Sequence, residues 1–193
     1  MDSILPKIYL VRHGETAWTI SGQHTGHTDI PLTKNGEEAA KALNLKLRNL
    51  NILKVFSSPL LRSRQTAELS GFRASIEIDN NLMEWDYGDF EGRRTADIRL
   101  EYPKWRLFED GCPNGETLKE VADRADRVIS RIRAINSNLL IFAHRDILRI
   151  VIMRWIGLNA VEARCLHLST ASVSMLGYDH DLNEPVIMLL NDD

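Results

Sequence analysis

Two short apolar runs, each of which ends at a histidine, constrain the fold of this chain more than any other feature of its sequence. Residues 7–11 (KIYLV) lead into the tripeptide Arg-His-Gly, whose histidine is His13, and residues 139–143 (LLIFA) lead directly into His144. Continuous apolar runs of this length, with β-branched or aromatic residues, are typical of buried strands. Each histidine is therefore expected where a buried strand ends and a loop begins.

Helical patterns alternate with these and other strand-like segments. Further strands are expected in LKVFSS (residues 53–58), SIEID (75–79), SVSMLGY (172–178) and PVIMLL (185–190). Helices are expected after Thr33, which offers an N-cap, after Pro59, over residues 116–135, and from Asp146, a second expected cap, to Trp155. The segment 80–92, which is rich in glycine and acidic residues, is expected to be a loop.

Strands that alternate with helices predict an α/β fold, namely a three-layer α/β/α sandwich around a mostly parallel sheet. Such folds bind ligands outside the carboxyl ends of their parallel strands. Arg12, His13 and His144 all lie at expected strand ends, so a site is predicted there. No internal repeat or linker-like stretch divides the chain, and we expect one domain over residues 1–193.

The composition excludes several kinds of protein. Acidic and basic residues are interspersed and the formal net charge is -3, so no basic face suited to nucleic acid is expected. Cys112 and Cys165 form no CxxC pair, which argues against a zinc site or a disulfide framework and favours a reducing compartment. Residues 1–14 lack the pattern of a secretion signal, and every apolar run is shorter than the roughly 20 residues that a membrane-spanning helix needs. We expect a cytoplasmic protein that does not span a membrane.

The segment LVRHGETAW carries the strongest chemical pattern. A histidine beside Arg12 at a strand end places a nucleophilic imidazole next to a guanidinium, and the following glycine lets the backbone approach an anion. Arg62, in the first turn of the helix after Pro59, supplies a second guanidinium. Arginine forks suit a phosphoryl group, and repulsion from two arginines lowers the pKa of His13, which favours a neutral, nucleophilic ring. The pattern predicts phosphoryl transfer to His13.

His144 and Glu84 complete this predicted chemistry. His144 is expected to donate a hydrogen bond to the equatorial oxygens of the phosphoryl group in transfer. Glu84 is expected to protonate the leaving oxygen and then to act as the base for water. Taken alone, each has a simpler interpretation, Glu84 as a solvated loop acid, His144 as a buried histidine and Arg62 as a helix-surface charge. Only their occurrence together favours a catalytic site.

The order of the motifs resembles that of the histidine phosphatase superfamily, in the branch related to cofactor-dependent phosphoglycerate mutase. The matching segments cover nearly the whole chain: LVRHGETAW, TGHTDIPLTKNGEEAA, SSPLLRSRQTAEL, LMEWDYGDFEG, EDGCPNGETLKEVADRADRVI, FAHRDILR and STASVSMLGYDH. The resemblance implies a phosphoglycerate-mutase-like fold and catalysis without a metal or other cofactor. Two segments, EWDYGDFEG and DGCPNGET, resemble relatives that include sugar-bisphosphate phosphatases, so a small sugar phosphate is the expected substrate.

Site residues follow from the resemblance position by position. It implies His13 as the phosphoryl acceptor, Glu84 as the proton donor, and Arg12, Arg62 and His144 around the phosphate. It further implies a substrate-binding set of Gln23, Thr25, Gly26 and Tyr87. The remaining histidines, His24, His27, His167 and His180, match no catalytic position and are expected in loops or on the surface.

Two positions depart from the family pattern. Arg145 stands where relatives commonly have a small or polar residue, and it is expected either to contact the substrate or to crowd it. Glu109 stands where an arginine is expected, which leaves open whether the substrate carries one phosphate or two.

Three questions stay open at this point, namely the reaction type, the presence of catalytic activity and the oligomeric state. The chain is too short for the insertion that helps phosphoglycerate mutases to shield phosphohistidine from water, which favours a phosphatase over the mutase alternative. A catalytically inactive phosphate-binding module is the other alternative, although the five catalytic positions are intact. Apolar helix faces can serve a core or a dimer equally, so a homo-oligomer is also open.

Overall fold

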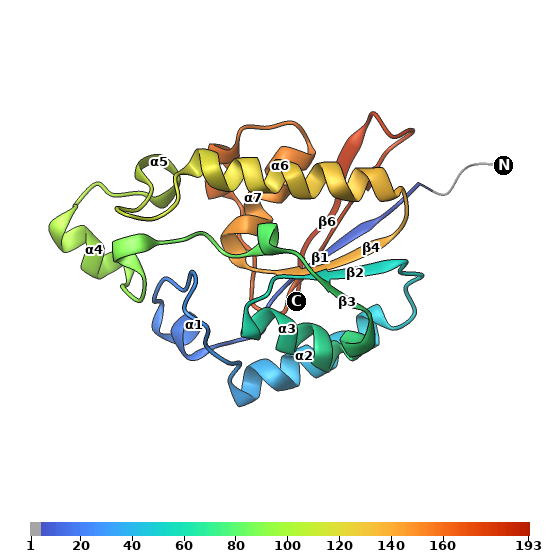
Figure 1. Ribbon diagram of the computed structural model, residues 1–193, viewed down its shortest axis with the longest axis horizontal. Helices are drawn as coiled ribbons and strands as arrows, with labels where there is room; N and C mark the ends of the chain where they lie inside the picture. The colour runs from blue at the N-terminus through green and yellow to red at the C-terminus, as the bar shows by residue number, and fades with distance from the viewer. Residues whose placement is uncertain (1–4) are drawn as a thin grey trace.

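The computed structural model describes residues 5–193, which form one six-stranded sheet with helices on both faces (Figure 1). The strands are β1 (Ile8–Arg12), β2 (Lys54–Ser57), β3 (Ile76–Ile78), β4 (Leu139–Ala143), β5 (Val173–Tyr178) and β6 (Pro185–Asp192). The helices are α1 (Ala17–Ser21), α2 (Lys34–Leu47), α3 (Leu61–Ala67), α4 (Thr95–Glu101), α5 (Leu107–Asp110), α6 (Leu118–Ile135) and α7 (Arg145–Trp155). The predicted three-layer α/β/α fold is confirmed.

The sheet is parallel in its centre and antiparallel at one edge. Its order is β3-β2-β4-β1-β5-β6, with β1, β2, β3 and β4 parallel to one another and β5 and β6 antiparallel additions. In the register of β1 with β4, Arg12 lies opposite Ala143. His13 and His144, each the next residue, therefore leave the sheet side by side at the carboxyl ends of these strands.

Cover on both faces explains why β4 is apolar without interruption. Leu139 and Ile141 of β4 belong to the core cluster shared with α6 and α7, whereas Leu140 and Phe142 belong to the cluster shared with α2 and α3. In Figure 1, α6 and α7 lie above the sheet and α2 and α3 lie below it. Because side chains of a strand alternate between faces, a strand buried on both sides has no polar position.

The helix ends agree with the sequence in part. Thr33 caps α2 as predicted, since its side chain accepts a hydrogen bond from the amide of Gly36 (3.0 Å). The expectation for Asp146 was wrong, because His144 is the N-cap of α7 and Asp146 lies within its first turn. The chain turns into the helix immediately after β4, so the amide of Asp146 is already helical. Pro59 lies two residues before the start of α3, although Arg62 is in the first turn as expected.

The segment between the Glu84 loop and α6 holds two short helices, α4 and α5, that no sequence pattern indicated. In Figure 1 both lie to the left of the sheet, above α1. Within residues 5–193, no helix has both the length and the apolar character required to cross a membrane.

Removing the buried side chain of Ile141 tests the two-sided core. We expect Ile141→Ala to lower the free energy of unfolding by about 2–5 kcal/mol, because it leaves a cavity in a fully covered strand. Leu100→Ala is the control, since Leu100 is 84% exposed and its loss should change stability by less than about 0.5 kcal/mol. Urea unfolding measures both values, and equal losses in the two variants would contradict this description of the core.

Candidate active site

A small cavity opens at the carboxyl ends of β1 and β4, where the sequence predicted a site. It holds about 110 Å³ and is lined by Arg12, His13, Trp18, Thr19, Gly22, Gln23, His24, Thr25, Glu84, Tyr87, Thr95 and Arg145. Seven of the ten predicted site residues are therefore in its wall. The other three lie behind this wall: Arg62 and His144 are fully buried, and Gly26 contacts Arg62.

The ring of His13 is held in one tautomer. Its Nδ1 lies 2.7 Å from the carbonyl oxygen of Gly14. A carbonyl oxygen only accepts hydrogen bonds, so Nδ1 carries the proton and, in the neutral ring, Nε2 keeps its lone pair. The geometry therefore prepares Nε2 as a nucleophile.

The surroundings of His13 keep its ring neutral. Burial is the largest cause that lowers its pKa well below the usual value, and the charges of Arg62 and Arg12 lower it further. The predicted repulsion from two arginines is thus present, but it is secondary to burial. A neutral His13 at neutral pH follows from both effects.

Arg12 and Arg62 are fixed by backbone carbonyl groups rather than by carboxylates. Nη1 of Arg12 donates to the carbonyl oxygen of Leu168 (2.6 Å). Nη2 of Arg62 donates to the carbonyl oxygens of Thr25 (3.1 Å) and Gly26 (2.9 Å). The Nε atoms of both arginines are buried and have no hydrogen-bond partner within residues 5–193.

A fully buried guanidinium, Arg62, and a partly buried one, Arg12, each have a buried Nε without a partner and suit an anion. Burial lowers the pKa of Arg12 to about 10, so that the group stays charged at neutral pH. A buried donor without a partner is costly, and a phosphoryl oxygen would satisfy it with a charge-assisted hydrogen bond.

His144 lies beside His13, with ring centroids 5.2 Å apart. Its Nε2 lies 2.8 Å from Oγ of Ser58, which also accepts a hydrogen bond from the amide of Leu60 (3.3 Å). In the tautomer in which the Ser58 hydroxyl donates to Nε2, the ring proton of a neutral His144 is on Nδ1. Burial, followed by the charge of Arg62, lowers the pKa of His144 well below its usual value. Nδ1 is buried and has no hydrogen-bond partner in the described part of the chain. An atom that donates to a bound phosphate would have no protein partner either.

Glu84 lies at the N-terminus of α7. Its carboxylate accepts hydrogen bonds from the amides of Trp85, Asp146 and Ile147 at 3.0–3.2 Å. These bonds favour the ionised form, but burial and the neighbouring charge of Asp146 outweigh them and raise the pKa of Glu84. A carboxyl group with a raised pKa in the wall of a cavity is suited to proton transfer.

Asp146 is the residue of this site that the sequence did not reveal. Its buried carboxylate accepts a hydrogen bond from the hydroxyl of Tyr87 (2.6 Å) and pairs with Arg145 (3.1 Å) and Arg149 (2.7 Å). Burial opposes its ionisation, but the two arginines outweigh burial and hold its pKa below the usual range. The predicted substrate residues Tyr87 and Arg145 are therefore positioned by Asp146.

The remaining predicted residues have identifiable contacts. Nε2 of Gln23 donates to the carbonyl oxygen of Gly92 (2.7 Å). A Cβ atom at Gly26 would lie 2.5 Å from the carbonyl oxygen of Trp85, so only glycine fits there. His24, expected in a loop or on the surface, lies in a loop and is buried in the cavity wall, with Nε2 3.1 Å from Oγ1 of Thr95. Nothing in the sequence distinguished it from the other unassigned histidines.

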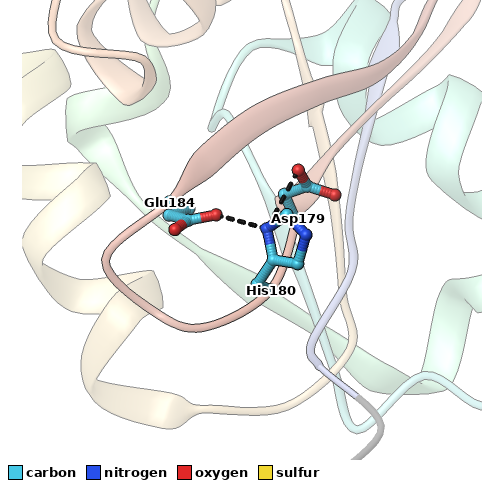
Figure 2. Close-up of side chains that lie close together, drawn as sticks. All are labelled: Asp179, His180 and Glu184. Carbon is cyan, nitrogen blue, oxygen red and sulfur yellow. Dashed lines mark hydrogen bonds and ion pairs between the residues drawn. The ribbon is translucent and has the colours of Figure 1, made fainter.

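One group of side chains in residues 5–193 has the composition of a metal site, but it lies elsewhere. Figure 2 shows His180 between Asp179 and Glu184, with Nδ1 3.2 Å and 2.6 Å from the two carboxylates. All three are exposed in the turn after β5. The site end of β5 is Val173, which pairs with Val11, so this cluster follows the opposite end of the strand. It forms surface ion pairs outside the cavity.

Comparison with known proteins agrees with this geometry. A family model described as the histidine phosphatase superfamily (branch 1) matches residues 8–193. The chain belongs to that superfamily. This histidine phosphatase is 36% identical over 186 residues to an acid phosphatase of Mycobacterium tuberculosis, a match that covers 94% of this chain and 91% of the relative.

Two further similarities concern a yeast relative and a solved structure. A sedoheptulose 1,7-bisphosphatase of Saccharomyces cerevisiae is 36% identical over 214 residues, which covers 94% of this chain and 78% of the relative. The solved structure of an open reading frame product of Mycobacterium tuberculosis superposes with a TM-score of 0.91 at 34% identity and covers 97% of both chains. The resemblance inferred from the motifs is therefore confirmed.

The buried histidines of this histidine phosphatase make its stability depend on pH. Burial lowers the pKa of His24 to about 4 and lowers those of His13 and His144 as well. Below pH 6.5 the unfolded chain binds protons that the folded protein does not, so the free energy of unfolding falls as pH decreases. Each such group contributes up to about 1.4 kcal/mol per pH unit.

Replacing one of these histidines tests the effect. We expect His24→Gln to reduce the loss of stability between pH 6.5 and pH 4.5, because the unfolded variant gains one proton fewer. Urea unfolding across this range measures the slope, and His180→Gln, at an exposed position whose neighbouring carboxylates raise its pKa, should not reduce it. An unchanged slope in His24→Gln would contradict a depressed pKa.

Proposed function

We propose that this histidine phosphatase is a phosphomonoesterase that transfers a phosphoryl group from a small phosphorylated metabolite to Nε2 of His13 and then to water. The observation that carries the proposal is the hydrogen bond from Nδ1 of His13 to Gly14, which leaves Nε2 free beside the buried Arg62 and the partly buried Arg12. No metal ion or other cofactor is required in this proposal, since Arg12, Arg62 and His144 supply the donors that neutralise phosphate.

The first step forms phosphohistidine. Nε2 of His13 attacks phosphorus, the bond from phosphorus to the ester oxygen breaks, and Glu84 gives its proton to the leaving oxygen. Arg12, Arg62 and Nδ1 of His144 stabilise the negative charge on the equatorial oxygens, because they are held in place before the reaction. The raised pKa of Glu84 supports its role, since a carboxyl group must be protonated to act as an acid.

The second step releases phosphate. Glu84, now ionised, takes a proton from water, and the water oxygen attacks phosphorus as the bond from phosphorus to Nε2 breaks. The bonding electron pair returns to Nε2, so His13 is again neutral and Glu84 is again protonated. Both residues end the cycle in the state in which they began it.

A sugar phosphate is the proposed substrate class. The cavity wall offers Gln23, Thr25 and Thr95, whose polar groups suit hydroxyl groups, and its volume of about 110 Å³ suits a small molecule. The yeast relative is named for a sugar bisphosphate, which supports the same class.

A cytoplasmic location is also part of the proposal. Both cysteines, Cys112 and Cys165, are free thiols, which supports it.

Replacing the proposed nucleophile is the primary test. We expect the unmodified protein to release phosphate from para-nitrophenyl phosphate and from sugar phosphates in EDTA, with inhibition by vanadate, and His13→Ala to fall to the background rate. His180→Ala is the matched control and should retain activity, because His180 is exposed and follows the end of β5 that is remote from the cavity.

Three results would contradict the proposal. Loss of activity in EDTA would exclude the metal-free mechanism, and isomerisation of 3-phosphoglycerate faster than its hydrolysis would favour a mutase. An unmodified protein that neither turns over any phosphate ester nor forms phosphohistidine would favour an inactive binding module.

Replacing Glu84 tests the proton donor separately. We expect Glu84→Gln to slow hydrolysis of a sugar phosphate about 10²–10⁴-fold, because the alkoxide leaving group needs a proton. Phosphohistidine formation from para-nitrophenyl phosphate should slow much less, because nitrophenolate leaves without one. Rapid-quench measurement of the phosphoenzyme compares the substrates, with Glu38→Gln as an exposed control. An equal loss on both substrates would show that Glu84 is not the acid.

A further inference from the structure

A third strand, β2, brings a serine to the same edge of the sheet as the two histidines. β2, β4 and β1 are neighbours and run parallel, so their carboxyl ends meet there. Ser57, the last residue of β2, lies opposite Phe142 of β4, and the amide of the next residue, Ser58, donates to the carbonyl oxygen of Phe142 (3.0 Å). Ser58, His144 and His13 therefore follow the ends of three adjacent strands.

The hydroxyl group of Ser58 is enclosed by protein. Ser58 has no surface in contact with solvent. Its Oγ lies 3.3 Å from the amide nitrogen of Leu60, which can only donate, and 2.8 Å from Nε2 of His144, which donates or accepts according to the tautomer of the ring. Among residues 5–193, Nε2 of His144 is thus the one acceptor that the Ser58 hydroxyl proton reaches.

The two neutral tautomers of His144 leave different numbers of buried groups without a partner. With the ring proton on Nε2, that proton goes to Oγ of Ser58, the hydroxyl proton has no acceptor in the described part of the chain, and Nδ1 is a buried acceptor without a donor. With the ring proton on Nδ1, the hydroxyl donates to Nε2 and only the Nδ1–H group lacks a partner. Each unpaired buried polar group is costly, so the tautomer with Nδ1–H is the more stable one.

A bound phosphoryl group removes the one group that is still unpaired. The ring of His144 lies beside that of His13, with centroids 5.2 Å apart. An Nδ1–H group donates to an anionic oxygen, whereas an unprotonated Nδ1 presents a lone pair that repels it. Burial and the charge of Arg62 keep His144 neutral near neutral pH, so its tautomer decides whether it attracts or repels the anion.

We infer that Ser58 is a positioning residue, whose hydroxyl group donates to Nε2 of His144 and thereby keeps the ring proton on Nδ1 for the phosphoryl group. The inference rests on the proposed function and deepens it, because it assigns the group that makes His144 a donor before the substrate arrives. Ser58 is absent from the lining of the active-site cavity and acts through His144. A donor that is fixed in advance needs no rearrangement during the reaction.

The two histidines are then held in the same tautomer by opposite means. A carbonyl oxygen, that of Gly14, accepts the proton on Nδ1 of His13 and leaves a lone pair on Nε2 for phosphorus. A hydroxyl group, that of Ser58, donates to Nε2 of His144 and leaves a proton on Nδ1 for the phosphoryl oxygens. One ring is thereby prepared as a nucleophile and the other as a hydrogen-bond donor.

Nuclear magnetic resonance of the full chain with ¹⁵N-labelled histidine measures the tautomer directly. Couplings to the ring protons distinguish Nδ1 from Nε2, and the nitrogen shift distinguishes a protonated from an unprotonated atom. The signals of His144 are those that are missing from the spectrum of His144→Gln. We expect a protonated Nδ1 and an unprotonated Nε2 near neutral pH, and a change in the Nδ1 signals when inorganic phosphate is added.

Replacing Ser58 tests the cause of this tautomer. We expect Ser58→Ala to move the ring proton of His144 from Nδ1 toward Nε2, to weaken binding of inorganic phosphate about tenfold or more, and to slow hydrolysis of para-nitrophenyl phosphate about 10²-fold. Ser63→Ala is the matched control, because it removes another fully buried hydroxyl of the same cluster, 3.0 Å from Oγ of Ser57 and without a hydrogen bond to His144. It should change neither the tautomer nor phosphate binding.

Three results would overturn the inference. A ring proton on Nε2 of His144 in the unmodified protein does so without any variant. A proton that stays on Nδ1 in Ser58→Ala would show that another group selects the tautomer, and an equal loss of phosphate binding in Ser58→Ala and Ser63→Ala would show an effect of packing alone.

Failure of the proposed function is a separate outcome, because the tautomer is measured without turnover. An unmodified protein that has Nδ1–H on His144 and binds phosphate, but hydrolyses no phosphate ester, would contradict the proposed function alone. An active enzyme with the proton on Nε2 of His144 would contradict the role of Ser58 alone.

Discussion

The parallel pairing of β1 with β4 is the constraint on which the rest of this molecule depends. The register that sets Arg12 opposite Ala143 places His13 and His144 next to each other at the edge of the sheet. Two helices on each face then bury all of β4 and most of β1. That burial is also the largest cause of the lowered pKa of each histidine. Fold stability and a neutral, nucleophilic imidazole thus have one physical origin.

The site brings charged and neutral ionisable side chains close together, and a different set of contacts holds each of them in place. Arg12 and Arg62 are held by carbonyl oxygens and not by carboxylates, so their charges remain available to an anion. Asp146 is held by Arg145 and Arg149, and its charge acts on Glu84. The proposed acid, the proposed nucleophile and two arginines without carboxylate partners coexist because each has its own fixed partner.

The sequence predicted the sheet and the catalytic centre because both depend on local patterns. Apolar runs such as residues 139–143 identify buried strands, and the residues that follow them must meet at one edge. It could not predict α4 and α5, which are short and lack a repeating apolar pattern, or the burial of His24, which depends on packing from these helices. Asp146 was assigned to a helix cap because a first-turn position and a cap position look alike in sequence.

Asp146 also bears on how this protein can change over evolutionary time. The same carboxylate fixes Tyr87 and Arg145 in the wall of the active-site cavity, pairs with Arg149 and raises the pKa of Glu84, the proposed acid. A mutation there would disturb the proposed substrate contacts and the proposed proton donor together. Arg106, Glu109 and Arg164 pair with one another at exposed positions outside this network, so mutations there leave Asp146 and its partners in place.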